Sequence, residues 1–417
     1  MRVGAKIATG AAFLLVAPIV LPATPATSWL PAWVSYFVEV GLYQRAHAAV
    51  LLLGALLVCA CYCRPTWGDP DRRTVWLLMS VLLAAYGVPT LQPTTPVSIV
   101  EGNSAILLAI AAGLLASRIA GTVSRAAAVL ITAASLQAVY AYLGLLSGEH
   151  VLVSGSLVRA GGTYDRPNAL GMLLASALPL STALMHMRRS AVATLACATC
   201  AMVLYCGLLL SGSRAAALGF LGGAVVAAAM AFPLLSDKSA RKVALTIAVT
   251  SGVLVVTVNV LRNLDPIRRE STARSTRGHV SYWQAGMNAF TKHWSLGAGA
   301  GSAMVSIPVH ANGVTEEVHV PVANNLLIEW LAEFGVAGGV LYVLFAKSIV
   351  AVLRAERGHV SAGLSGAWTA YAVTGWFVPS YGSSNRPGGV VLGMLVGMTI
   401  LCIRGTGSRA SSAGHRQ

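Results

Sequence analysis

The sequence predicts an all-α, polytopic membrane protein, and its composition, the spacing of its apolar runs and the positions of its basic residues support this fold class. Hydrophobic residues make up 56% of the 417 residues and charged residues only 10%, with a mean hydropathy of +0.70. This composition is too apolar for an ordinary soluble domain. The net charge of +15 comes from short basic clusters between apolar runs, so membrane orientation explains it and no nucleic-acid partner is expected.

The apolar runs predict about 12 transmembrane helices, because a helix of about 20 apolar residues crosses a bilayer. Residues 1–22 form either the first span or a cleaved signal peptide. The other runs fall at 46–63, 74–91, 98–117, 124–147, 167–187, 190–211, 214–235, 242–261, 325–353, 360–378 and 387–404. Three regions follow: an N-terminal transmembrane bundle (1–261), a long polar loop (262–324), and C-terminal transmembrane helices with a tail (325–417).

The basic residues orient these helices. Most of the 29 lysines and arginines fall in segments that lie on one side together with both termini, which the positive-inside rule makes the cytoplasmic side. The long loop is then on the outer side. Apart from Lys292, the outer basic residues are arginines, whose planar guanidinium suits bidentate contact with phosphate. They indicate a phosphate-bearing ligand.

Two short outer turns carry such arginines. The first runs Arg159-Ala-Gly-Gly-Thr-Tyr-Asp-Arg166-Pro-Asn168, in which glycines permit a tight turn and proline suits the start of a helix. Its alternative interpretation is a plain turn with incidental arginines. In the second, Ser213-Arg214 occupies a short hairpin between two spans, where the arginine either binds a ligand or only reaches the membrane interface.

The long loop contains Arg274 and Arg277, followed by apolar residues at helical spacing that predict an amphipathic surface helix. The glycines from 297 to 301 then form either a flexible turn or a weak phosphate cradle. The loop ends at His319 and at Asn324-Asn325, either of which caps the next helix. The helix N-terminus also favours an anion.

Glu329 and Glu333 lie one turn apart on that next helix, where a structural ion pair is as plausible as catalysis. The seven cysteines lie in or beside apolar runs, and we expect neither a disulfide framework, a metal site nor a cofactor. Internal repeats of the transporter kind do not stand out in the sequence.

Taken in order, these motifs resemble those of the O-antigen ligase and polymerase superfamily. The matching features are the Gly-Thr-Tyr…Pro-Asn-Ala-Leu-Gly turn, the Ser213-Arg214 pair, the long outer loop with its Arg…Trp…Leu-Gly-Ala-Gly segment, and the helix start Asn-Asn-Leu-Leu-Ile-Glu-Trp-Leu-Ala-Glu-Phe-Gly. They span about residues 160–340. Each motif is loose alone, whereas their order is fairly specific.

The resemblance implies a glycosyltransferase in the inner membrane of a bacterium, with both termini cytoplasmic and the long loop periplasmic. It implies a metal-independent, inverting transfer of glycan from an undecaprenyl-pyrophosphate donor to a glycan or lipid-linked glycan acceptor. Arg214 and Arg277, with Arg274 as a near alternative, correspond to the arginines that hold the pyrophosphate. Such groups stabilise the leaving group electrostatically. Other expected substrate contacts come from Arg159, Arg166, Asn168, Asn325 and Glu333.

The chain departs from the family at Asn324. Ligases of this family have histidine there as the presumed general base, and asparagine cannot accept a proton at neutral pH. Either His319 serves instead, or the enzyme belongs to a polymerase branch without that base, or activity is lost. Polymerase is therefore slightly favoured over ligase, and a standard lipid A-core ligase of lipopolysaccharide synthesis is disfavoured. The alternative from another class is a transporter or flippase of the same lipid-linked glycan.

Overall fold

The computed structural model describes residues 110, 113–114, 116–117, 120, 122–148, 151–154, 157–164, 167–187, 190–234, 266–295, 297, 304–311, 314–321, 325–355, 358–378 and 386–413. This part is mostly helical. Its elements, in chain order, are α7 (Val123–Ser147), β1 (Val151–Ser154), β2 (Leu157–Ala160), α8 (Pro167–Met187), α9 (Ala191–Ser211), α10 (Arg214–Ala231), η3 (Phe232–Leu234), α12 (Pro266–Lys292), β3 (Met304–Ala311), β4 (Val314–Pro321), α13 (Leu326–Ala355), α14 (His359–Gly375) and α15 (Arg386–Ala413).

Four helices, α7 to α10, are long and apolar enough to cross a membrane, and they coincide with four predicted spans. The expected spans at 325–353, 360–378 and 387–404 correspond to α13, α14 and α15. The interval 1–109 and the expected span at 242–261 lie outside the described residues, so the total of about 12 spans stays a prediction.

The outer face of α9 shows what these helices contact. Val192, Leu195 and Met202 are 78%, 68% and 63% exposed, although each is apolar. An exposed apolar stripe along a helix of this length suits lipid rather than water. The predicted membrane character is thus visible in the packing as well as in the composition.

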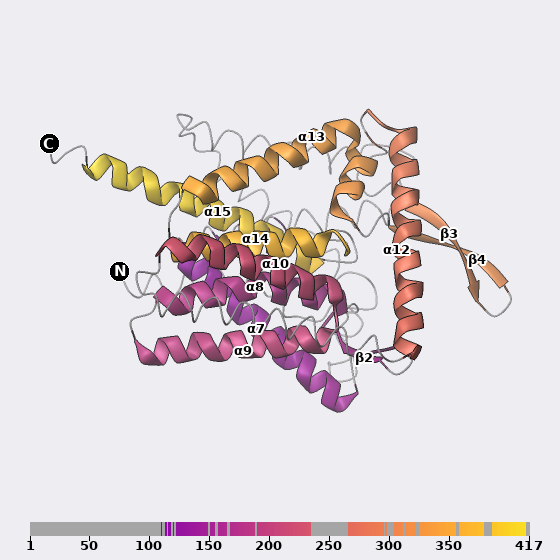
Figure 1. Cartoon of the computed structure of the whole chain (residues 1–417), viewed down its shortest axis with the longest axis horizontal. Coiled ribbons are helices and arrows are strands. Elements are labelled where there is room, and N and C mark those ends of the chain that lie inside the picture. Colours follow the sequence, from indigo (N-terminus) through magenta and orange to yellow (C-terminus); the bar gives the residue numbers. More distant parts are fainter. Residues whose placement is uncertain are drawn as a thin grey trace, which may run out of the picture.

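The bundle helices lie side by side (Figure 1), and small residues let them pack backbone against backbone. A Cβ on Gly219 of α10 would collide with Thr374 of α14, and one on Gly223 would collide with the carbonyl of Gly366. In a bilayer, where apolar burial between helices gains little, such close contact is the main source of helix association. Helices α8 and α10 pack in the same way, because a Cβ on Gly171 would lie only 2.8 Å from the Cβ atoms of Ser213 and Ala216 at the start of α10.

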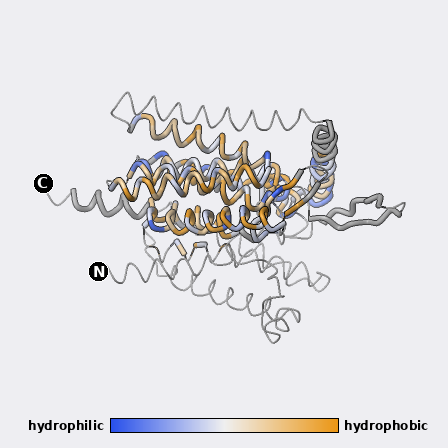
Figure 2. The backbone as a smooth tube through the Cα atoms, turned by 90° about the horizontal axis from the view of Figure 1, so that it is seen from below, coloured by the Kyte–Doolittle hydropathy of each residue, from blue (hydrophilic) through white to orange (hydrophobic). Residues whose placement is uncertain are grey.

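Helix α12 lies across one end of this bundle, as both the front view and the view turned by 90° show (Figures 1 and 2). It includes the surface helix that the sequence predicts, but it is 27 residues long and begins already at Pro266. Its inner stripe is formed by residues that recur at helical spacing, namely His279, Trp283, Gly286 and Phe290, all at least partly buried.

Two antiparallel hairpins interrupt the expected all-α pattern, and neither is among the elements predicted from the sequence. Strands β1 and β2 pair Val151 with Ala160, beside the helix ends. Strands β3 and β4 pair Met304 with Pro321 and project away from the bundle on the far side of α12 (Figure 1).

Helix α13 is broken at Gly335, whose φ of 64° and ψ of −156° are not helical. The turn that ends α12 packs into this break. The amide of Val336 donates to the carbonyl of Trp294 at 2.8 Å, and a Cβ on Gly297 would collide with the carbonyl of Glu333. At Gly297 the glycine-rich segment after α12 therefore makes a close backbone contact with α13, and this contact holds α12 against α13.

Candidate functional site

The candidate site lies where several helix ends meet, at the end of the bundle that α12 crosses (Figure 1). Helices α8 and α10 begin at this end, and α14, which packs antiparallel to α10, finishes there. The first residues of α13 join them through Asn325, whose side-chain amide donates to the carbonyl of Trp376 just after α14 at 3.2 Å. The topology thus brings together four segments that are far apart in the sequence.

Arg159 ties two of these ends together. From β2, its Nε donates to the carbonyl of Ser211 at 2.9 Å, and its Nη2 donates to Oδ1 of Asn168 at 2.6 Å. The guanidinium therefore bridges the last residue of α9 to the first turn of α8. At least part of its role is to position the helix ends, and Asn168 serves as one of its acceptors.

The Gly-Gly-Thr turn after β2 is held by hydrogen bonds to Gln137, a fully buried residue of α7. Its amide nitrogen donates to Oγ1 of Thr163 at 2.8 Å, and its amide oxygen accepts from the backbone N–H of Thr163 at 3.1 Å. Gly162 has a φ of 67°, and a Cβ there would lie only 2.7 Å from the Gln137 oxygen. The conformation that glycine permits and the buried amide together hold the turn that leads to α8.

Replacing Gln137 by leucine is expected to lower stability by about 1–3 kcal/mol, because the N–H and hydroxyl of buried Thr163 lose their partner. Thermal unfolding of the purified protein in detergent measures the change. Thr132→Val is the matched control on the same helix, since the hydroxyl of exposed Thr132 only returns to the carbonyl of Ala128. Equal shifts of the unfolding temperature for the two variants would contradict the proposal that Gln137 stabilises the turn.

Arg214 is the first residue of α10 and its side chain is exposed. The cap before it is well formed, since Oγ of Ser213 accepts from the amide of Ala216 at 3.4 Å and Oγ of Ser211 accepts from the amide of Ser213 at 3.2 Å. The serines that flank the arginine thus stabilise the helix start. The positive end of the helix dipole and the guanidinium lie at the same place, which favours an anion there.

Helix α12 contacts these helix ends through Trp283. The centroid of the Trp283 ring lies 6.3 Å from that of Phe377, just after α14. One turn earlier, His279 is half-buried, and its pKa is lowered first by burial and then by the positive charge of Arg214. His279 therefore lies within electrostatic reach of Arg214. The sequence analysis did not single out His279; its i, i+4 spacing from Trp283 on the covered stripe is the signal that could have found it.

Asn325 caps α13, as one of the two predicted alternatives requires. Its Oδ1 accepts from the amides of Leu327 and Ile328 at 3.0 and 3.1 Å. Because its amide nitrogen also donates to Trp376, both ends of this side chain are engaged within the protein. Asn325 thus joins the start of α13 to the end of α14.

Glu329 and Glu333 are both buried, at 5% and 6% exposure, in the short helical segment before the break in α13. They are one turn apart, as the sequence predicts. Glu333 lies where the turn after α12 packs against α13, since its carbonyl faces Gly297. Among the residues that the structure describes, no hydrogen-bond partner approaches Oε2 of Glu329.

The remaining predicted residues are placed less closely. Arg274 and Arg277 belong to α12, the element that crosses the helix ends, and only their backbone is described. His319 pairs with Ser306 in the β3–β4 hairpin, which α12 separates from the helix ends (Figure 1). Two further candidates, Arg166 and Asn324, lie outside the described residues.

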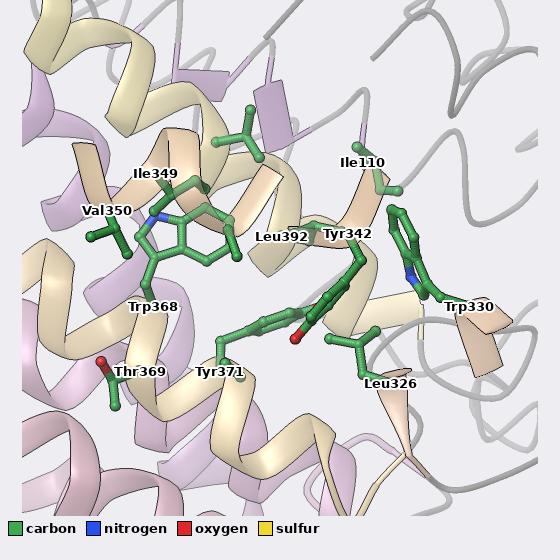
Figure 3. A pocket seen from close by; sticks show the side chains of 13 residues that line it. Ile110, Leu326, Trp330, Tyr342, Ile349, Val350, Trp368, Thr369, Tyr371 and Leu392 are labelled. Atoms are coloured by element: carbon green, nitrogen blue, oxygen red, sulfur yellow. The ribbon is translucent and has the colours of Figure 1, made fainter. Parts of the chain in front are cut away.

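An apolar cavity of about 200 Å³ lies between α13, α14 and α15. Figure 3 shows Tyr342 and Tyr371 converging at its centre, with Trp330 and Trp368 on either side. Its lining suits a hydrocarbon group rather than a sugar. Leu326 and Trp330, which line it, belong to the same short segment of α13 that carries Glu329.

Residues 195–343 match the model of a family described as O-antigen ligase. The matched interval includes Ser213-Arg214, all of α12, the β3–β4 hairpin and the break in α13. It confirms the resemblance that the motifs indicate. A search of curated proteins found no matching relative.

Proposed function

Because the match over residues 195–343 supports membership of the chain in the O-antigen ligase and polymerase superfamily, we propose that the protein is a membrane glycosyltransferase of surface polysaccharide synthesis. It transfers or polymerises glycan from an undecaprenyl-pyrophosphate donor. The observation that carries the proposal is Arg214, exposed at a capped helix start beneath α12 and inside the matched interval.

The proposed reaction needs no metal. An acceptor hydroxyl attacks the anomeric carbon with inversion, and the bond from that carbon to the pyrophosphate breaks. Arg214 binds the leaving pyrophosphate, together with the positive end of α10. Arg277, or Arg274 one turn earlier, contributes the second guanidinium from α12. Fixed donors of this kind stabilise the developing charge without reorganising during the reaction.

The acceptor is proposed to approach over the start of α13. Asn324 orients its hydroxyl, and Arg166 contacts the donor glycan at the edge of the turn before α8. Arg159, Asn168 and Asn325 act mainly by holding the helix ends in place, because their side chains hydrogen-bond to other parts of the protein. Glu333 acts through the docking of α12 on α13.

In the proposed topology, about 12 spans place both termini in the cytoplasm and the 262–324 loop in the periplasm. The bundle of 1–261 and the helices of 325–417 then form the walls of the site, and the loop covers it from the outer side. Polymerase is slightly favoured over ligase, because asparagine stands at 324 where ligases of the family have histidine.

The experiment that tests this function separates transfer from transport. The full chain is reconstituted into liposomes that contain undecaprenyl-pyrophosphate-linked oligosaccharide prepared from its own host, and the lipid products are identified by mass spectrometry. Transfer releases free undecaprenyl pyrophosphate and yields a longer lipid-linked glycan. A flippase would only change the leaflet in which the intact donor is found, and that outcome would replace our proposal with the transport alternative.

A further inference from the structure

His279 has no role in the mechanism above, yet it is half-buried within electrostatic reach of Arg214. It is carried by the stripe of α12 that faces the helix ends, one turn before Trp283, which contacts Phe377. Its position within reach of the Arg214 charge places it above the capped start of α10.

One nitrogen of the His279 ring has no hydrogen-bond partner among the described residues. This nitrogen, Nδ1, is buried. Burial and the Arg214 cation both disfavour the charged form, so the folded-state pKa is below 6.5 and the ring is neutral at physiological pH. Arg214 of α10 is the charged group that acts on the ring, whereas Trp283, one turn further along α12, contacts the uncharged ring of Phe377 just after α14. A neutral imidazole offers one nitrogen as a proton acceptor.

On the basis of the proposed function, we propose that His279 is the general base that removes the proton from the acceptor hydroxyl. The hydroxyl oxygen forms the new bond to the anomeric carbon, and its proton passes to the imidazole. The bond between the anomeric carbon and the pyrophosphate oxygen breaks, and the pyrophosphate leaves as an anion against Arg214. The imidazolium then returns its proton to water on the outer side. The charges balance, because the base gains the positive charge as the leaving group becomes an anion.

Other candidates fit this task less well. Asn324 cannot accept the proton at neutral pH. His319 belongs to the hairpin that projects beyond α12 (Figure 1), and His293 is exposed at the far end of α12, after its last helical residue. His279 alone among these histidines lies on the covered stripe above Arg214. The base that the family places at the start of α13 is supplied here from α12.

The test uses the full chain in liposomes, with three variants, the lipid-linked donor described above and a separate binding assay with undecaprenyl pyrophosphate alone. His279→Gln is expected to reduce the transfer rate about 100- to 10,000-fold and to leave undecaprenyl pyrophosphate binding within about twofold of the wild type. His279→Arg, which offers a better phosphate ligand but no base, is expected to be equally inactive. His293→Gln, the matched control on the same segment, keeps full activity.

The pH profile supplies a second readout. Wild-type kcat/KM should fall as pH drops through the His279 pKa, below 6.5, because the protonated ring cannot accept a proton. The residual activity of His279→Gln should show no such acid limb. Retained activity in His279→Arg together with weakened lipid binding in His279→Gln would overturn the inference and make His279 a phosphate ligand. Failure of the wild-type chain to bind undecaprenyl pyrophosphate would instead overturn the proposed function.

Discussion

Replacing Arg214 by alanine is expected to reduce glycan transfer about 100- to 1,000-fold, which is the usual cost of removing one group that stabilises a developing negative charge. The loss follows from position. Arg214 is exposed at the start of α10, where the helix dipole adds to its charge, and His279 of α12 lies within electrostatic reach of it. The measurement is release of undecaprenyl pyrophosphate in liposomes, with the length of surface glycan in a complemented deletion strain as the cellular readout.

Two further variants make this prediction specific. Arg214→Lys keeps the positive charge but loses the planar fork, so its activity should lie between those of wild type and Arg214→Ala. Arg125→Ala is the matched control, because Arg125 is an exposed arginine in the first turn of α7, at the other end of the bundle. Full activity in Arg214→Ala, or an equal loss of activity in Arg125→Ala, would show that the pyrophosphate does not bind at the start of α10.

The helical framework could be predicted from the sequence because membrane spans depend on local composition. The predicted runs at 124–147, 167–187 and 190–211 agree with α7, α8 and α9 to within one residue at each end. The hairpins were missed for the opposite reason. In β4, Glu316, Glu317 and the terminal Pro321 weaken the strand pattern, and pairing with β3 depends on register that no local signal specifies.

The site was predicted in part. The arginines at 159 and 214 were identified by the bias against outer basic residues, and the structure places both at the same helix ends. Composition could not show that Arg159 binds Ser211 and Asn168, because this contact joins segments whose packing is set by small residues between helices. For the same reason His279 could not be predicted as a site residue. The face of α12 that contacts the bundle is defined only once the bundle is formed.

The same dependence on packing predicts a large effect for Gly335→Ala. The φ of 64° and ψ of −156° at Gly335 fall in a region that is essentially restricted to glycine, so a side chain there costs about 1–3 kcal/mol of backbone strain. A Cβ would also lie 2.5 Å from the backbone of Ser295, in the turn after α12, which adds an overpacking cost of about 1–3 kcal/mol. Relief of this clash moves α12 away from α13.

Gly335→Ala should therefore lower both the thermal unfolding midpoint in detergent and the transfer rate, because α12 carries the residues above Arg214. Hydrogen exchange at the amide of Val336, which donates to Trp294, should accelerate as the contact opens. Gly148→Ala is the matched control, since Gly148 also has a positive φ, 76°, but a Cβ there meets nothing within 4 Å. It should show only the intrinsic cost of about 1–2 kcal/mol and keep its activity. If both variants lose activity equally, backbone strain alone explains the effect, and the docking of α12 on the break in α13 does not position the site.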